Sequence, residues 1–236
     1  MMNRFNSTLK IGEIVNAFPK AADIFKEYRV DFCCGGNRPL SEAINEQNIN
    51  ESELLYKINS EYEIYEANAK DKNWAEASTS EIIEQILNKH HAYLWSELPK
   101  ISKLSTTILR VHGPHYSELS KVHKLFSTLK MELEEHLNKE ETIQYPAIKE
   151  YERTNSQSDL KKAVDIIDDL ESEHTNAGDI LKELRKITND FTMPEGGCET
   201  FDLTYQKLHE LESDVFQHIH LENNILFPRL RNLLNK

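Results

Sequence analysis

The sequence contains little glycine, proline or cysteine, and it has no long apolar run. Its 236 residues include 7 Gly and 7 Pro, so long stretches are free of the residues that interrupt helices. No apolar stretch approaches the length of about 18 residues that a transmembrane helix needs. The first residues, MMNRFNSTLKIGEIVNAF, have neither the apolar core nor the cleavage site of a signal peptide. These absences predict a cytoplasmic protein that is rich in helix and has no membrane partner.

Basic residues are outnumbered by acidic ones, and cysteine is scarce. The formal net charge is −12 and the sequence pI is about 5.3, which argues against binding to nucleic acid or to an anionic membrane. The three cysteines, two of which are adjacent, do not make a disulfide framework. We therefore expect reduced thiols and no nucleic-acid partner.

The pattern of helix-breaking residues divides the chain into two parts. Residues 1–68 have the pattern of short helices with frequent breaks, and residues 69–79 form a polar linker without periodicity. Residues 80–236 are helical in pattern, in four long segments at about 80–111, 115–152, 159–189 and 199–235. Short connections favour antiparallel neighbours. We therefore predict an all-α protein, with a small N-terminal helical domain followed by an antiparallel up-down-up-down four-helix bundle. Kinks are expected at Pro99, Pro146 and Pro228.

Two segments of the predicted bundle carry the same motif, His-x-x-x-Glu followed by an aromatic residue and proline. One copy contains His136 and Glu140, and the other contains His218 and Glu222. A spacing of four residues places each pair on one face of a helix. A single pair of this kind on an acidic helix is usually a solvated face. The recurrence with the same tail instead favours a metal site built inside the bundle.

Residues that meet in one layer of a bundle lie at similar distances from the turns that join its helices. His136 follows Gly113 by 23 residues, and His91 precedes it by 22. The remaining mismatches of two to four residues amount to about 3–6 Å of helix rise. The predicted layer contains His91, His136, Glu140, His174, His218 and Glu222. The other histidines are expected on the surface or between helices: His90, His112, His115, His123, His209 and His220.

These six side chains are too many for a structural zinc, which usually has four ligands. Imidazole binds iron, and carboxylates can bridge two ions. The set therefore fits a pair of iron ions bridged by Glu140 and Glu222. Each ligating imidazole also needs an acceptor for its second nitrogen, and Glu132 and Glu173 are candidates. The structural alternative is a helical adaptor whose histidines are incidental.

The motifs together resemble those of a known family. The pairs His136-x-x-x-Glu140 and His218-x-x-x-Glu222, with Glu173-His174 between them, resemble the hemerythrin-like domain. Pro19 to Phe25 and the motif Asp31-Phe32-Cys33-Cys34-Gly35-Gly36 look like the small domain ahead of it in the iron–sulfur cluster repair di-iron proteins (RIC, or ScdA/YtfE-type family). The resemblance covers nearly the whole chain. It implies that the same six ligands hold two iron ions in a non-haem di-iron centre with oxo and carboxylate bridges.

The resemblance also implies a function in the stress response. Family members restore iron–sulfur enzymes damaged by nitric oxide or peroxide, by donation of iron. Two alternatives remain open: a di-iron nitric oxide reductase that forms nitrous oxide, and a binding module that senses O2 or NO. The expected partners are damaged iron–sulfur proteins and the small ligands NO or O2, and a homodimer is left open.

Cys33 and Cys34 are adjacent in the turn before Gly35 and Gly36. Adjacent cysteines rarely form a disulfide with each other, because the ring strains the peptide between them. The functional hypothesis is a thiolate site that passes iron, holds a cluster transiently or handles electrons. The alternative is a pair of small residues packed in a small core. Cys198 has no expected role beyond that of a surface thiol.

Overall fold

The computed structural model describes residues 4–67 and 74–235, and every regular element in these ranges is helical. The all-α prediction is therefore confirmed. Part of the predicted linker 69–79 lies outside the described residues. The chain divides into two compact units, here called unit 1 (Met1–Ile82 with Gln217–Lys236) and unit 2 (Ile83–Phe216). Within the described ranges, no helix is both long enough and apolar enough to cross a membrane.

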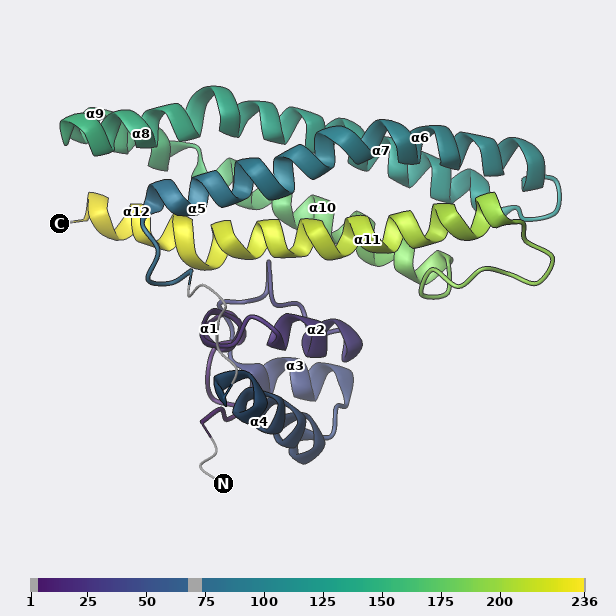
Figure 1. Cartoon of the computed structure of the whole chain (residues 1–236), viewed down its shortest axis with the longest axis horizontal. Helices are drawn as coiled ribbons and strands as arrows, with labels where there is room; N and C mark the ends of the chain where they lie inside the picture. The colour runs from purple at the N-terminus through teal and green to yellow at the C-terminus, as the bar shows by residue number, and fades with distance from the viewer. Residues whose placement is uncertain (1–3, 68–73, 236) are drawn as a thin grey trace. The chain divides into compact units, whose positions relative to one another are not determined.

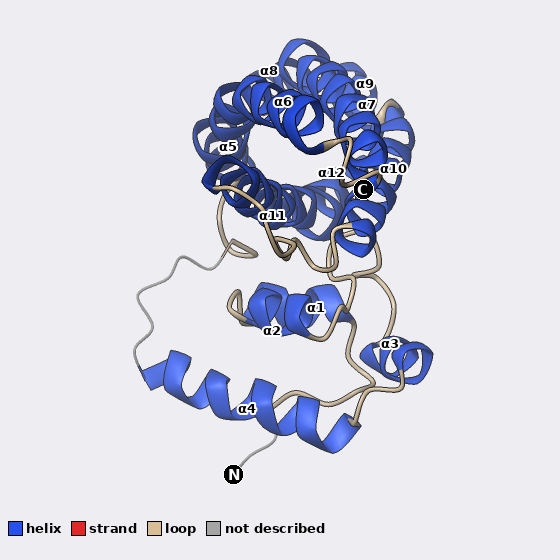
Figure 2. Ribbon diagram, turned by 90° about the vertical axis from the view of Figure 1, so that its right-hand side faces the viewer, coloured by secondary structure: helices blue, strands red, loops and turns tan. Residues whose placement is uncertain are grey.

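Unit 2 is a bundle of long helices that run up and down. α7 packs against both α6 and α10, and these helices run alongside one another in Figure 1 and are seen nearly end-on in Figure 2. α5 and α11 each cross the limit between the two units. The elements are α5 (Thr79–Gln85), η1 (Ile86–His91), α6 (Ala92–His112), α7 (Glu118–Lys139), η2 (Glu140–Gln144), α8 (Tyr145–Thr154), α9 (Gln157–Asp165), α10 (Ile167–Ile187) and α11 (Glu199–Leu221).

The core of unit 2 follows directly from the spacing of apolar residues. α7 buries one residue in every three or four, and each of these is at most 4% exposed: Leu119, Val122, Phe126, Leu129 and Leu133. This spacing gives a helix one apolar stripe, which another helix must cover. Burying one such side chain contributes about 1.5–3 kcal/mol. The stripe therefore determines which face of α7 points inward, and the predicted ligand His136 continues the same buried face.

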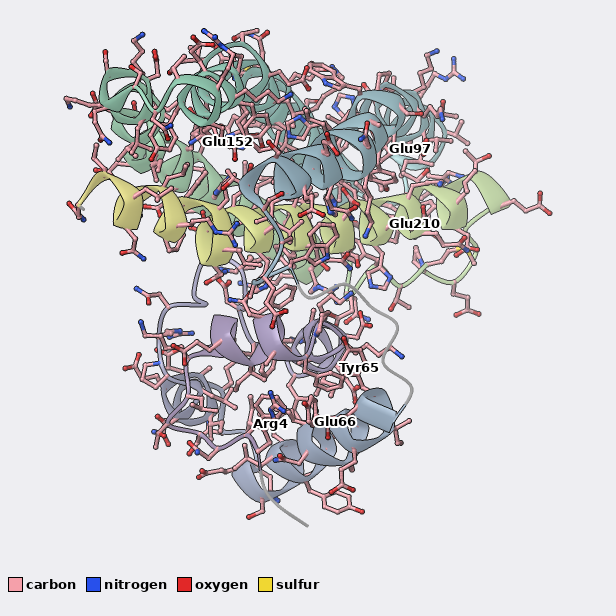
Figure 3. The ribbon with its side chains drawn as sticks, turned by 60° about the vertical axis from the view of Figure 1, so that its left-hand side comes forward. Arg4, Tyr65, Glu66, Glu97, Glu152 and Glu210 are labelled. Atoms are coloured by element: carbon pink, nitrogen blue, oxygen red, sulfur yellow. The ribbon has the colours of Figure 1, made fainter. Side chains whose placement is uncertain are left out.

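Ion pairs add to the outer surface of unit 2. Lys207 of α11 lies 3.4 Å from Glu97 of α6 and 2.7 Å from Glu210 of its own helix, and Figure 3 labels both carboxylates. Partly exposed pairs of this kind contribute about 0–1 kcal/mol. These ion pairs therefore contribute little to the free energy of folding, which comes mainly from the buried apolar stripe.

Three π-helical segments interrupt the helices of the described chain, and the sequence did not predict them. η1 ends at His91, η2 begins at Glu140 and η3 (Glu222–Leu226) begins at Glu222. η2 and η3 stand directly before Tyr145-Pro146 and Phe227-Pro228, where kinks were expected. Proline has no N–H, and its ring clashes with the carbonyl four residues earlier, so a widened turn accommodates it. Each π-segment also begins or ends at a predicted ligand.

Unit 1 contains a cluster of shorter helices and the C-terminal end of the chain. Its elements are α1 (Ile11–Ala17), α2 (Ala21–Glu27), α3 (Leu40–Gln47), α4 (Glu51–Ala67), the last residues of α11 from Gln217, η3, and α12 (Phe227–Leu234). Aromatic rings make part of its core, with Phe5 edge-on to Tyr62 at a centroid distance of 5.1 Å. Arg4 lies over the Tyr62 ring and pairs with Glu66 at 3.5 Å, near Tyr65 in Figure 3. These contacts attach the N-terminal residues to α4.

Candidate metal centre

His91 and Glu140 face each other inside unit 2. His91 Nε2 lies 3.2 Å from Glu140 Oε2, and the side chains are 2% and 0% exposed. The other ring nitrogen, Nδ1, lies 2.9 Å from Glu141 Oε1. An ionised carboxylate can only accept, so this contact places the imidazole proton on Nδ1. The Nε2 lone pair then points at a carboxylate oxygen, and two such acceptors need a proton or a metal cation between them.

His136 repeats this arrangement from α7. Its Nε2 lies 3.4 Å from Glu140 Oε1 and 3.0 Å from His174 Nε2 of α10, whereas its Nδ1 lies 2.9 Å from Glu173 Oε2. Two ligands at right angles, each about 2.1 Å from an ion, are about 3.0 Å apart. The spacing of the two imidazole nitrogens therefore fits one edge of an octahedral metal site.

Glu140 connects these two groups. Its Oε2 faces His91 and its Oε1 faces His136, so one carboxylate presents each oxygen to a different imidazole. One ligand atom from each of His136, Glu140 and His174 lies within 4.8 Å of the others. All of these residues are at most 2% exposed. A buried carboxylate among neutral imidazoles would be costly without a compensating cation. Unit 2 therefore contains a group of donors that can hold metal.

The second His-x-x-x-Glu pair lies in unit 1. His218 stands in the last turn of α11 and Glu222 is the first residue of η3. His218 Nε2 lies 3.1 Å from Glu222 Oε2, and the side chains are 2% and 0% exposed. Like the first pair, it is buried and points a ring nitrogen at a carboxylate oxygen. The structure thus brings His91, His136, Glu140 and His174 together in unit 2, and His218 and Glu222 together in unit 1.

Two carboxylates next to the predicted ligands contact the imidazoles. Glu173, which the sequence singled out, accepts hydrogen bonds from His136 and from Lys139, and these bonds hold the pKa of Glu173 below its ordinary value. Glu141 accepts from His91 and from Trp95 Nε1, each at 2.9 Å. Sequence reasoning missed Glu141, whose only signal was its position directly after Glu140. Glu132 is half-buried, and its buried Oε2 has no hydrogen-bond partner in the described part of the chain.

Two of the remaining histidines are buried. His90 is 1% exposed, and its Nδ1 lies 2.9 Å from Asp214 Oδ1 of α11, which makes it an interhelix residue. His220 is 6% exposed and lies in unit 1, with Nδ1 3.4 Å from the carbonyl oxygen of Phe32. Burial lowers the pKa of His220 to about 4, so its ring is neutral at pH 7. The other four are partly or fully exposed: His112, His115, His123 and His209.

The cysteine turn, here residues 31–36, is an ordered part of unit 1. Cys33 is 2% exposed and Cys34 is half-buried, and their sulfur atoms lie 3.7 Å apart. Asp31 Oδ1 accepts the backbone N–H groups of Cys34 and Gly35, both at 3.0 Å. Burial raises the pKa of the Cys33 thiol well above its ordinary value. The thiol of Cys33 is therefore protonated at pH 7 when no metal is bound.

Asn224 of η3 attaches this turn to the C-terminal helix within unit 1. Its Nδ2 donates to the carbonyl oxygens of Cys33 at 3.0 Å and Phe32 at 3.3 Å. A Cβ atom at Gly36 would lie 2.3 Å from Asn224 Oδ1, so glycine is required there by the close approach. In an α-helix the carbonyl of Asn224 would accept the N–H of residue 228, but that residue is Pro228, which has no N–H. The carbonyl instead accepts a hydrogen bond from Asn16 Nδ2 at 3.2 Å. The cysteine turn and the π-segment η3, which begins at the predicted ligand Glu222, are thus directly hydrogen-bonded.

Comparison with known proteins agrees with this architecture. Residues 8–62 match the ScdA_N family, a domain of unknown function, and residues 83–230 match the hemerythrin HHE cation binding domain. A probable iron–sulfur cluster repair protein of Haemophilus influenzae is 33% identical, over 94% of this chain and 96% of its own. The iron–sulfur cluster repair protein YtfE of Cronobacter sakazakii is 35% identical, over 93% of this chain and 94% of its own. The iron–sulfur cluster repair protein ScdA of Staphylococcus haemolyticus is 31% identical, over 93% and 96%. With its buried His and Glu groups and both matching domains, the chain belongs to the family of iron–sulfur cluster repair proteins.

Proposed function

We propose that this protein repairs iron–sulfur clusters damaged by nitric oxide or peroxide, by supplying iron that it holds between its buried His and Glu side chains. The names of the similar proteins support the repair function. The observation that carries the metal assignment is the pair of imidazoles at Glu140. His91 and His136 direct Nε2 at its two oxygens, while Glu141 and Glu173 engage their Nδ1 atoms. The proposal places the protein in the cytoplasm, where thiols are kept reduced.

Two iron ions fit this donor set better than one. A closed structural site usually has four ligands, and the set has six: His91, His136, Glu140, His174, His218 and Glu222. Each oxygen of Glu140 has its own imidazole, which suits a bridging carboxylate between two ions. We assign Glu222 the second bridge because it repeats the His-x-x-x-Glu spacing and is equally buried. α11 runs uninterrupted from Glu199 to Leu221, so His218 directly continues a helix of the bundle.

The residues around the ligands control how the iron is held. Glu141 and Glu173 keep the protons of His91 and His136 on Nδ1, which leaves each Nε2 lone pair for the metal. Imidazole and carboxylate form a less closed site than a four-thiolate cage. Such a centre supplies ferrous iron as cargo for a cluster that has lost it. Damaged iron–sulfur proteins are therefore the proposed partners.

The first test is the iron content of protein purified without oxygen. We expect about two irons per chain in the wild type. The double variant His136→Ala/His218→Ala should retain less than about a tenth of that, because each half of the ligand set loses an imidazole. His123→Ala is the matched control, since His123 lies on the same helix as His136 and contacts Thr106 instead. Equal iron in the wild type and the double variant would refute the assignment and favour the helical adaptor.

The second test separates repair from the alternatives. Iron-loaded protein is mixed with an iron–sulfur enzyme that peroxide has inactivated, and the return of its activity is followed. Repair predicts recovery with the wild type and with His123→Ala, and none with the double variant. A nitric oxide reductase predicts nitrous oxide in a single turnover of the reduced protein. Recovery that does not depend on His136 and His218 contradicts the proposal.

A further inference from the structure

The three side chains at the start of the cysteine turn have the spacing of metal ligands. Two sulfurs that are each about 2.3 Å from a tetrahedral ion lie about 3.8 Å apart, and a carboxylate oxygen lies about 3.6 Å from such a sulfur. In unit 1 the Cys33 and Cys34 sulfurs are 3.7 Å apart, and Asp31 Oδ1 lies 3.4 Å from Cys33 Sγ. One ligand atom from each of the three residues lies within 4.8 Å of the others. No large movement is needed to bring them to one ion.

We propose that Asp31, Cys33 and Cys34 form a second metal site, which takes one thiophilic divalent ion such as ferrous iron. The site supplies three donors, two sulfurs and one oxygen. A tetrahedral ion has four positions, so one position stays open for a donor from another molecule. A site with three ligands and an open position binds less firmly than a closed one, and it can pass its ion on.

Backbone contacts hold the three donors in place. Asp31 Oδ1 accepts the N–H groups of Cys34 and Gly35, which keeps the carboxylate beside the sulfurs. On the other side of the turn, Asn224 donates to the carbonyl of Cys33. Ligands fixed in this way lose little further freedom when an ion binds. Cys34 is half-buried, so part of this residue remains exposed to solvent.

The location of this site suits it to a step in the proposed repair function. That step rests on the proposed function, whereas the metal site itself does not. Asn224 stands two residues after the assigned iron ligand Glu222, and it is hydrogen-bonded to Cys33. A thiol site at the π-segment that carries an iron ligand is suited to receive iron on its way to a recipient. Uptake is balanced as one divalent ion in and two thiol protons out, with no change of oxidation state.

Cobalt titration of the full-length reduced protein tests the site directly. Co²⁺ bound to thiolate gives a sulfur-to-metal charge-transfer band, which His and Glu ligands do not give. In the His136→Ala/His218→Ala background, where the His and Glu centre is disabled, we expect the band to saturate at one cobalt per chain, and to disappear when Cys33→Ser/Cys34→Ser is added. Asp31→Asn keeps an oxygen for the two N–H groups but removes the charge, and should weaken cobalt binding at least about tenfold. Cys198→Ser, at the exposed cysteine, should bind like the wild type.

Each outcome decides the proposal. No charge-transfer band, or a band that survives in Cys33→Ser/Cys34→Ser, overturns it. An unchanged affinity in Asp31→Asn removes the carboxylate from the site and overturns the three-donor form. The iron centre is judged separately, because His136→Ala/His218→Ala should lose iron and still show the cobalt band. A wild type without iron but with the band would contradict the proposed function alone.

Discussion

Replacing Glu173 by glutamine tests whether the carboxylates beside the ligands control metal affinity. Glu173 accepts one hydrogen bond from His136 Nδ1 at 2.9 Å and another from Lys139. Glutamine keeps an acceptor oxygen but loses the charge that makes the bond to the imidazole strong. Loss of such a partner usually weakens metal binding 10–100-fold, which is about 1.4–2.7 kcal/mol. We expect Glu173→Gln to weaken iron binding by a factor in this range.

The assay is competition for ferrous iron between the protein and a chelator of known affinity, at pH 7 and without oxygen. Glu135→Gln is the matched control, because Glu135 is an exposed neighbour of His136 and the substitution removes the same charge. The control separates a change in the overall field from the loss of the specific contact. Iron affinities that agree within about twofold in Glu173→Gln and Glu135→Gln would refute the reasoning. Thermal unfolding of both variants checks that the bundle remains folded.

Two further predictions concern stability. Burial raises the pKa of Tyr205 to about 12 from its ordinary value of 10.0, so the fold favours the neutral ring. This contribution is fully present below pH 10 and is lost as the pH rises from about 10 to 12, by up to about 2.7 kcal/mol. Urea unfolding should show a smaller alkaline loss in Tyr205→Phe than in the wild type or in Tyr56→Phe, at an exposed ring; three parallel curves would contradict this. Gly36→Ala places a methyl group 2.3 Å from Asn224 Oδ1 and should lower the free energy of unfolding by about 1–3 kcal/mol. Gly197→Ala, which meets a flexible methionine side chain, is its control, and equal losses in the two variants would argue against a tight contact at the cysteine turn.

Local spacing along the chain was enough to predict the helical framework. Helical periodicity depends on residues three and four positions apart, so the apolar stripes and the His-x-x-x-Glu pairs are visible without any tertiary information. The four predicted segments correspond to α5–α6, α7–α8, α9–α10 and α11–α12, apart from short breaks at their ends. The motif around Cys33 and the pair at His136 also indicated the family, which the comparisons support.

Contacts between helices could not be predicted from local spacing, because they depend on how each helix is rotated and shifted along its neighbour. Glu173 stands beside His174 in the sequence, yet its carboxylate contacts His136 on another helix. Beyond its position directly after Glu140, Glu141 has no local feature that distinguishes it as the partner of His91. The π-segments also require the structure, because proline explains why a turn widens but does not specify the residues it includes. Local spacing along the chain thus shows which residues are candidate ligands and on which helix faces they lie. Helix packing sets which carboxylate contacts which imidazole, and it brings Asn224 to the cysteine turn across 191 positions of the chain.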